Sequence, residues 1–271
     1  MISVVVPTRD RPDALARCLA ALARQCGDEL EILVVDDSAG GGAVAPGVRV
    51  VRAGGRGPAA ARNLGARAAR GEIVCFTDDD CVPAPEWAHR IAAACADGGA
   101  AAGPTLADPA AGPAAAAAQL LTNTLMLSTR TRAPDAGAVL GFAPTCNLAC
   151  HAATLRALPF DESFALAAGE DRDWCARLVA SGRRLRHVPD APVVHRPSLG
   201  LAGLVRQQVR YGRGAVGFRD AGGALADAGF YRRLARATAQ AGPRTAACVA
   251  LAQACVAAGA ALALAEQRLA R

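Results

Sequence analysis

The stretch Gly71-Glu-Ile-Val-Cys-Phe-Thr-Asp-Asp-Asp-Cys-Val-Pro83 decides the fold of this chain. Its apolar run, Ile73 to Phe76, predicts a short buried strand. Three carboxylates, Asp78, Asp79 and Asp80, follow where that strand should end. Adjacent negative charges repel one another unless a positive charge lies among them, and hard oxygen ligands suit Mg²⁺ or Mn²⁺. The pattern therefore predicts a divalent-cation site, with a solvated acidic loop as the alternative.

The composition indicates one large α/β domain, alone or with an appendage, because 52% of the 271 residues are hydrophobic. The net charge is +6, and every basic residue is arginine, which suits phosphate and acidic head groups. Nucleic acid is a weaker candidate partner, since aromatic residues make up only 4% of the chain. The ten cysteines follow no zinc or disulfide spacing, so we expect buried thiols and a cytoplasmic protein without a signal peptide.

Strands and helices alternate in the first half of the chain, which predicts parallel strands joined by right-handed crossovers. Pro7 is expected to end the first strand. The predicted strands are Ile2 to Val6, Glu31 to Val35 and Val48 to Arg52, and the predicted helices are Asp13 to Ala23 and Pro58 to Arg70.

Polar residues follow three of these predicted strands. They are Thr8-Arg9, Asp36-Asp37 and the triple Asp78 to Asp80. In a parallel sheet these strand ends share one edge, where ligands of open α/β sheets bind. A ligand with a polar ring, a diphosphate and a cation would suit them, which points to a nucleotide. Arg62 on the neighbouring helix could reach the same site or be an ordinary surface charge.

Five motifs, in this order along the chain, resemble those of the family 2 glycosyltransferases with the GT-A fold. The resemblance covers roughly residues 1 to 200. The motifs are Val-Val-Pro-Thr-Arg-Asp-Arg-Pro, Val-Val-Asp-Asp-Ser, Ala-Arg-Asn-Leu-Gly, Phe-Thr-Asp-Asp-Asp-Cys-Val-Pro, and Gly-Glu-Asp-Arg-Asp-Trp followed by Val-Val-His.

The resemblance implies a Rossmann-like, mostly parallel sheet flanked by helices, with a C-terminal helical extension. We expect a glycosyltransferase domain over 1–200, divided into a nucleotide-binding half (1–105) and an acceptor half (106–200). Residues 201–271 would form the helical extension.

The resemblance also assigns donor-side roles. Pro7, Thr8 and Arg9 would line the base and ribose, Asp36 and Asp37 would receive the base, and Arg62 would touch the base or the diphosphate. In the Asp-X-Asp motif, Asp78 and Asp79 would lie on the donor side, with Asp78 nearer the ribose. Asp80 would bind Mn²⁺ or Mg²⁺, with His195 as a further metal or diphosphate contact.

Asp171, beside Glu170, would be the catalytic base. Burial and the neighbouring carboxylates Glu170 and Asp173 would raise its pKa toward the working range of a base. The alternative is that Glu170-Asp171 begins a helix and stabilises its N-terminus. Both can hold together, because a helix N-terminus can present Asp171 to a pocket.

Three further residues have open alternatives at this stage. His195 follows two valines, where a structural histidine is as ordinary as a metal ligand. Trp174 could stack on an acceptor sugar or pack in the core. Asn147 lies in an apolar run, Val139 to Leu148, which resembles the acceptor-side strand, and it would position a loop or the acceptor.

The connection from Ala107 to Ala118 is rich in alanine, proline and glycine and reads as an irregular connector, with a helix from Ala115 to Ser128. Gln207, Arg210 and Tyr211 resemble the Gln-X-X-Arg-Trp segment of processive members, with tyrosine in place of tryptophan. An uncharged stretch, Ala246 to Ala265, is long enough to cross a bilayer, but its alanine content favours a docking or interfacial helix at the inner face of a membrane.

These features predict an inverting, metal-dependent glycosyltransferase that moves a sugar from a nucleoside diphosphate, UDP being the expected carrier, to an acceptor hydroxyl. A sugar nucleotidyltransferase would want a glycine-rich phosphate loop after the first strand, and Thr8-Arg9-Asp10-Arg11-Pro12 has no glycine. A non-catalytic homologue that binds a nucleotide sugar or a partner would be expected to lack Asp80, Asp171 or His195, and all three are present.

Overall fold

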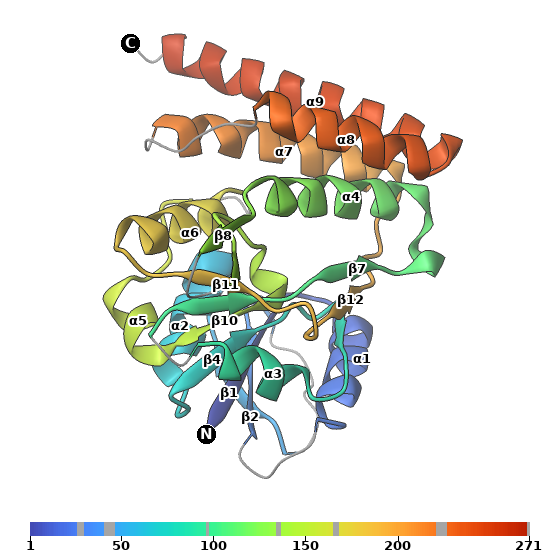
Figure 1. Cartoon of the computed structure of the whole chain (residues 1–271). Coiled ribbons are helices and arrows are strands. Elements are labelled where there is room, and N and C mark those ends of the chain that lie inside the picture. The colour runs from blue at the N-terminus through green and yellow to red at the C-terminus, as the bar shows by residue number, and fades with distance from the viewer. Residues whose placement is uncertain are drawn as a thin grey trace.

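The computed structural model describes residues 1–25, 30–40, 47–95, 98–133, 137–164, 168–220 and 227–269. In these ranges a nine-stranded sheet runs through the molecule, flanked by helices (Figure 1). From edge to edge its strands are β3 (Arg49–Arg52), β2 (Leu30–Asp36), β1 (Ile2–Thr8), β4 (Ile73–Phe76), β10 (Leu148–His151), β6 (Ala100–Ala102), β11 (Leu185–His187), β9 (Gly137–Val139) and β8 (Thr131–Ala133). The predicted α/β architecture is confirmed.

Side-chain alternation along the central strands gives the sheet two apolar faces. Val5 and Phe76 contribute to one face, which is covered by α2 (Pro58–Ala68), α5 (Ala152–Ala157) and α6 (Glu170–Ala180). Val4 and Val6 contribute to the other face, which is covered by α1 (Pro12–Leu22) and α3 (Trp87–Ala93). The near-continuous apolar runs of these strands therefore follow from burial on both sides.

The strands β3, β2, β1 and β4 are mutually parallel, as predicted. However, Pro7 does not end β1, which continues to Thr8. The pairing of β1 with β4 stops at Val5. Pro7 therefore lies beyond the last residue paired with β4, where a missing N–H costs no hydrogen bond to that strand.

The second half of the sheet begins with β10, which runs antiparallel to both β4 and β6. The strand predicted over Val139 to Leu148 is wrong, because β9 ends at Val139 and β10 begins at Leu148. The side chain of Asn147 holds the intervening segment. Its amide nitrogen donates to the carbonyls of Pro104 and Ala191 (3.0 and 2.9 Å), and its oxygen accepts from the indole of Trp87 (2.8 Å). Asn147 thus positions loops.

A second, smaller sheet has the order β5 (Cys81–Pro83), β12 (Val193–His195) and β7 (Thr105–Ala107). β12 runs antiparallel to β5 and parallel to β7, and His195 is paired with Cys81. Because β5 starts directly after the triple aspartate, this pairing brings residues more than a hundred positions apart to one place.

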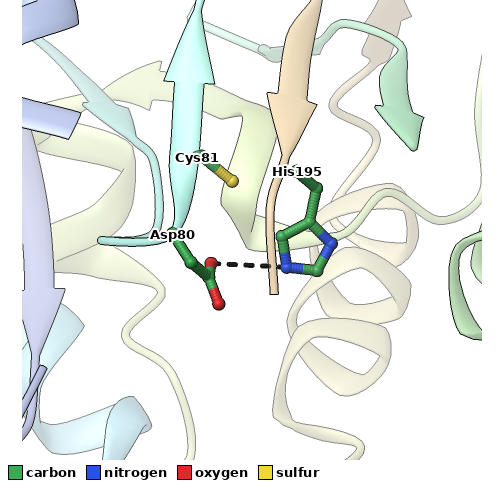
Figure 2. Close-up of side chains that lie close together, drawn as sticks. All are labelled: Asp80, Cys81 and His195. Carbon is green, nitrogen blue, oxygen red and sulfur yellow. Dashed lines mark ion pairs between the residues drawn. The ribbon is translucent and has the colours of Figure 1, made fainter. Parts of the chain in front are cut away.

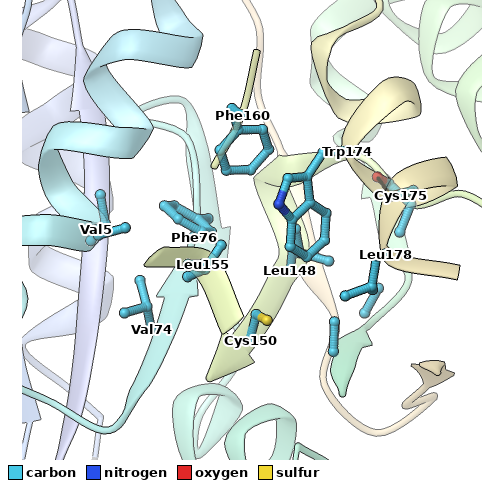
Figure 3. Close-up of a cluster of buried hydrophobic side chains, with 14 of the residues drawn as sticks. Val5, Val74, Phe76, Leu148, Cys150, Leu155, Phe160, Trp174, Cys175 and Leu178 are labelled. Atoms are coloured by element: carbon cyan, nitrogen blue, oxygen red, sulfur yellow. Dashed lines mark hydrogen bonds between the residues drawn. The ribbon is translucent and has the colours of Figure 1, made fainter. Parts of the chain in front are cut away.

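Aromatic residues from β4, from α6 and from the loop between α5 and α6 pack together in the core (Figure 3). The Trp174 ring is fully buried and stacks on Phe160, with centroids 5.3 Å apart, and Phe160 meets Phe76 edge to face at 5.8 Å. The indole nitrogen donates to the carbonyl of Leu158 (2.8 Å). Trp174 is therefore a core residue that fixes the first turn of α6 over β4.

Four helices form a separate layer, at the top of Figure 1. The helix α4 (Gly112–Ser128) underlies α7 (Leu201–Asp220), α8 (Ala228–Gln240) and α9 (Pro243–Leu269), and apolar side chains of all four form one cluster. The helical extension is thus confirmed. α4 starts three residues before the predicted Ala115, and Pro113 occupies its first turn, where a missing N–H is harmless.

The helices α7 and α9 touch through their backbones. A Cβ atom at Gly212 would overlap the carbonyl oxygen of Val256, and one at Gly259 would overlap that of Val209. Glycine at these two positions is what permits the close crossing.

Of the helices in the described ranges, α9 has the length and apolar composition that a membrane span requires, with 22% of its most apolar stretch buried. It packs along α7 and α4, as a docking helix would. The cysteines of the described ranges are free and buried, as expected, and Cys26 lies outside these ranges.

Candidate active site

The parallel strands β1, β2 and β4 end at one edge of the sheet, and the polar residues that follow them meet there, as predicted. The hydroxyl of Thr8 donates to Asp79 Oδ2 (2.7 Å), which ties the end of β1 to the acidic loop after β4. The backbone N–H of Asp37 donates to the carbonyl of Thr8 (2.9 Å), which ties β1 to the end of β2.

Asp37 anchors the loop that leads into α2. Its two carboxylate oxygens accept the backbone N–H groups of Arg56 (2.8 Å) and Gly57 (3.0 Å). Arg9 lies 4.0 Å from the same carboxylate, and the neighbouring Asp36 accepts the N–H of Ser38 (2.9 Å). Pro7, Thr8 and Arg9 therefore lie beside both aspartates, where the sequence predicts that the base of the nucleotide binds.

Asp80 and His195 face each other across the pairing of β5 with β12 (Figure 2). His195 Nε2 lies 3.3 Å from Asp80 Oδ1, and the backbone N–H of Arg196 donates to the carbonyl of Asp80 (2.8 Å). Asp80 Oδ1 is buried and accepts no well-aligned hydrogen bond. The pairing of β5 with β12 therefore places the imidazole of His195 beside the carboxylate of Asp80, whose Oδ1 atom makes no well-aligned hydrogen bond.

The two groups stabilise each other's charged forms. Burial would raise the pKa of Asp80, but the contact with His195 and the charges of His195 and Arg11 outweigh burial and lower it. Burial would lower the pKa of His195, but the contact with Asp80 and its charge raise that pKa to about 9. The contact between Asp80 and His195 thus favours the ionised carboxylate and the imidazolium together.

Two residues of α4 that the sequence did not single out orient His195. Asn123 donates through Nδ2 to the backbone carbonyl of Thr105 (2.9 Å), so its Oδ1 faces Gln119 and accepts from Gln119 Nε2 (2.9 Å). Gln119 Oε1 therefore points at His195 Nδ1, at 2.8 Å, and accepts a hydrogen bond from the Nδ1–H group. This chain of contacts turns His195 Nε2 toward Asp80, as in metal sites where the second imidazole nitrogen is fixed by a hydrogen bond.

Arg11 is a third residue that the sequence did not single out. Its guanidinium lies 2.7 Å from Asp79 Oδ1 and 2.8 Å from Asp80 Oδ2. Asp79 has no exposed surface, and burial raises its pKa to about 6 despite the charge of Arg11 and the hydrogen bond from Thr8. The middle aspartate thus points inward to Thr8 and Arg11, while Asp78 and Asp80 flank it.

Arg62 joins the acidic loop to the acceptor half. Its guanidinium lies 3.3 Å from Asp78 and 3.1 Å from Glu170, the first residue of α6. Arg62 is 6% exposed, and although burial opposes its charge, these two carboxylates raise its pKa. A buried arginine thus brings the Asp-rich loop and the start of α6 together.

Asp171 follows at the N-terminus of α6. Gly169 precedes the helix with φ of 105°, a conformation that favours glycine. The carboxylate of Asp171 accepts a hydrogen bond from the backbone N–H of Arg172 (2.8 Å), and Asp171 is partly exposed. Burial, and then the charge of Glu170, raise the pKa of Asp171 to about 7. Asp171 thus begins a helix and also presents a carboxyl that titrates near neutrality.

The end of α7 lies beside the start of α6. Arg172, in the first turn of α6, lies over the ring of Phe218 on α7 at 4.4 Å. The part of α7 that contains Phe218 therefore packs against the first turn of α6.

Asp80 and His195 fit a divalent cation. Together with Cys81 their ligand atoms lie within 4.8 Å of one another. Two ligands about 3 Å apart suit adjacent positions around an ion with bonds of about 2.1 Å. Cys81 is a poor third ligand, because the contact with Cys146 and burial raise its pKa well above the usual range and keep it a thiol. Oxygen and imidazole ligands suit Mn²⁺.

Comparison with known proteins agrees with this arrangement. Residues 3–153 match the model of the family described as glycosyl transferase family 2. The chain belongs to glycosyl transferase family 2. It is 28% identical over 230 residues to the pre-mycofactocin glycosyltransferase of Mycobacterium tuberculosis, a match that covers 79% of this chain and 47% of that protein. The chain therefore spans about half the length of this relative.

Solved structures of other proteins share the fold. A mannosyltransferase from Pyrobaculum calidifontis, in complex with GDP-Man and Mn²⁺, matches with a TM-score of 0.57 and 22% identity over 99% of this chain and 80% of the other. GalNAc-T7 with UDP, GalNAc and Mn²⁺ matches with a TM-score of 0.57 and 16% identity over 73% and 43%. The predicted GT-A fold is thereby confirmed.

Proposed function

We propose that this family 2 protein is an inverting, metal-dependent glycosyltransferase that moves a sugar from a nucleoside diphosphate, with UDP as the expected carrier, to an acceptor hydroxyl. The observation that carries this proposal is the single site in which Asp80 faces His195 while Arg62 joins Asp78 to Glu170, beside Asp171. The matching solved structures hold GDP-Man or UDP together with Mn²⁺, which supports a nucleotide-sugar donor.

On the donor side, Thr8, Arg9 and Asp37 form the base and ribose wall, because they lie together at the ends of β1 and β2. Asp80 and His195 hold the cation, which when bound offsets the charge that develops on the departing diphosphate. Gln119 keeps His195 Nε2 directed at the cation. Arg62 and Asp78 lie between this site and α6.

On the acceptor side, Asp171 accepts the proton of the attacking hydroxyl. Its raised pKa, about 7, matches that role, since a base works best when its pKa lies near the operating pH. Glu170 is bound to Arg62 and acts by positioning and by raising the pKa of Asp171. A base placed across the sugar from the leaving group gives direct displacement with inversion.

A screen of nucleotide sugars with Mn²⁺, read out as released nucleoside diphosphate, tests this proposal. We expect slow, Mn²⁺-dependent release from one donor and none in excess EDTA. Release that persists in EDTA would contradict the metal role. Absence of both binding and release across UDP-, GDP- and dTDP-sugars would favour the non-catalytic alternative.

We also propose that the outer face of the helical layer rests on an anionic membrane surface. Both α8 and α9 bury one face against α4, so their exposed faces point away from the sheet. The exposed residues of α8 include Arg232, Arg233 and Arg236, and those of α9 from Ala247 to Ala261 are all alanine. The uncharged stretch of α9 beside an arginine cluster matches anionic head groups in charge and an interfacial layer in polarity.

Cosedimentation with vesicles tests this location. We expect binding to vesicles that contain phosphatidylglycerol, little binding to phosphatidylcholine alone, and weaker binding after Arg232→Gln, Arg233→Gln and Arg236→Gln are combined. A control combines Arg17→Gln on α1 with Arg24→Gln in the turn after that helix. Equal binding by both variants would contradict the assignment of this face.

A further inference from the structure

Arg11 occupies the position of a counter-ion within the proposed metal site. It lies in the turn between β1 and α1, and its two terminal nitrogens contact different aspartates, Nη2 at 2.7 Å from Asp79 Oδ1 and Nη1 at 2.8 Å from Asp80 Oδ2. The other oxygen of Asp80 faces His195 at 3.3 Å. One oxygen of Asp80 therefore pairs with Arg11, while the other faces the imidazole of His195.

Arg11 and its two aspartate partners differ in their freedom to move. The carboxylate of Asp79 is fully buried and that of Asp80 is 8% exposed, whereas half of the Arg11 side chain is exposed. Asp79 is also fixed by the hydroxyl of Thr8 (2.7 Å). Because Arg11 is half exposed and its carboxylate partners are buried, Arg11 can move into solvent once another cation replaces its charge, while the aspartates stay in place.

A divalent cation that binds Asp80 must compete with Arg11 for this carboxylate. The ion carries two charges against one, which favours it once it is partly dehydrated beside His195. A guanidinium displaced from Asp80 remains within a side-chain length of the ion. That is where the donor diphosphate, which the ion also binds, would lie, and a planar guanidinium suits phosphate oxygens.

We propose that Arg11 is an internal counter-ion of the metal site. It neutralises Asp79 and Asp80 before a divalent cation binds, releases Asp80 when the cation arrives, and then pairs with the donor diphosphate. This inference rests on the proposed function, because it requires that Asp80 and His195 bind the cation.

The experiment compares Mn²⁺ binding and UDP or GDP binding in wild type, Arg11→Met and Arg11→Lys, with Arg17→Met, an exposed arginine of α1, as the matched control. Titration calorimetry with Mn²⁺ alone should show about five- to tenfold tighter binding to Arg11→Met, since a competitor worth roughly one ion pair is gone. Nucleoside diphosphate binding at saturating Mn²⁺ should weaken by a similar factor. Arg11→Lys should lie between wild type and Arg11→Met in both measurements.

Thermal unfolding separates this effect from a folding defect. Arg11→Met should unfold at a lower temperature than wild type in EDTA and gain more from Mn²⁺ than wild type does. If Arg11→Met does not fold, Arg11→Lys still tests whether Mn²⁺ binding tightens and whether nucleoside diphosphate binding weakens. Equal or weaker Mn²⁺ binding in a folded variant would overturn the counter-ion role, whereas a wild-type protein that binds no Mn²⁺ would refute the proposed function itself.

Discussion

Two aspartates, Asp80 after β4 and Asp171 at the start of α6, behave in opposite ways. Asp80 contacts Arg11 and His195, and these partners lower its pKa although burial opposes them. At the start of α6, the arginine partner belongs to Glu170, and the pKa of Asp171 is raised to about 7. The same type of side chain is thus held ionised at Asp80 and poised to accept a proton at Asp171.

The largest expected effect tests the acceptor side. Asp171→Asn removes the proposed base but keeps the shape of the helix start, so turnover should fall by about 10²- to 10⁴-fold. Donor and Mn²⁺ binding, measured by calorimetry, should change little, because no metal ligand is altered.

Asp173→Asn is the matched control on the same helix, since Asp173 pairs with Arg177 at 2.7 Å. It should retain most of the turnover. If both variants keep wild-type turnover, the proton acceptor lies elsewhere.

An intermediate effect tests the donor side. Gln119→Met removes the acceptor for His195 Nδ1–H, so the imidazole is no longer held with Nε2 toward Asp80. We expect Mn²⁺ affinity to fall by about 10- to 100-fold, as for other residues that orient a metal ligand. Calorimetric titration with Mn²⁺ measures it.

Gln119→Glu retains an oxygen acceptor and should keep near wild-type affinity. Thr122→Val on α4 controls for disturbance of the helix, since this hydroxyl only bonds back to Ala118. Equal affinities in Gln119→Met and Thr122→Val would show that His195 needs no such support.

The smallest expected effect tests what raises the pKa of Asp171. The base must be ionised, so kcat/KM of the wild type should rise with pH through an inflection near 7, the pKa of Asp171. The charge of Glu170 is one cause of the raised pKa, so Glu170→Gln should move the inflection to lower pH. At pH 6 the variant should then retain a larger fraction of its maximal rate than the wild type does.

Glu162→Gln, which removes a carboxylate bonded to Arg56 and Asn63, is the control for this profile. It should leave the inflection in place. An inflection that stays put in Glu170→Gln would mean that burial alone sets the pKa of Asp171.

The sequence predicted the donor edge well, because it depends on local patterns. Apolar runs predict β1, β2 and β4, and parallel strands necessarily place Thr8, Asp36 and Asp78 at one edge. The predicted strand over Val139 to Leu148 failed because the backbone of that segment bonds locally and not in a strand ladder. The N–H groups of Gly141 and Phe142 donate to the Thr129 hydroxyl, and Thr145–Asn147 forms a 3-10 turn.

Arg11 and Gln119 could not be predicted from sequence alone, since their roles depend on tertiary contacts. Arg11 lay inside a quoted motif, but nothing local indicates that it reaches two aspartates about seventy positions away. Gln119 lay in the predicted helix from Ala115 to Ser128, and its contact with His195 depends on how α4 packs over β7, the strand paired with β12.

The glycine crossing of α7 and α9 has one more consequence. Contact between bare backbones is possible only where Gly212 and Gly259 lie, so the last helix has a single docking position and cannot slide by a turn. Residues added to or removed from the link between α8 and α9 would have to be absorbed within that link. The glycine crossing, and not the length of that link, therefore sets where α9 lies.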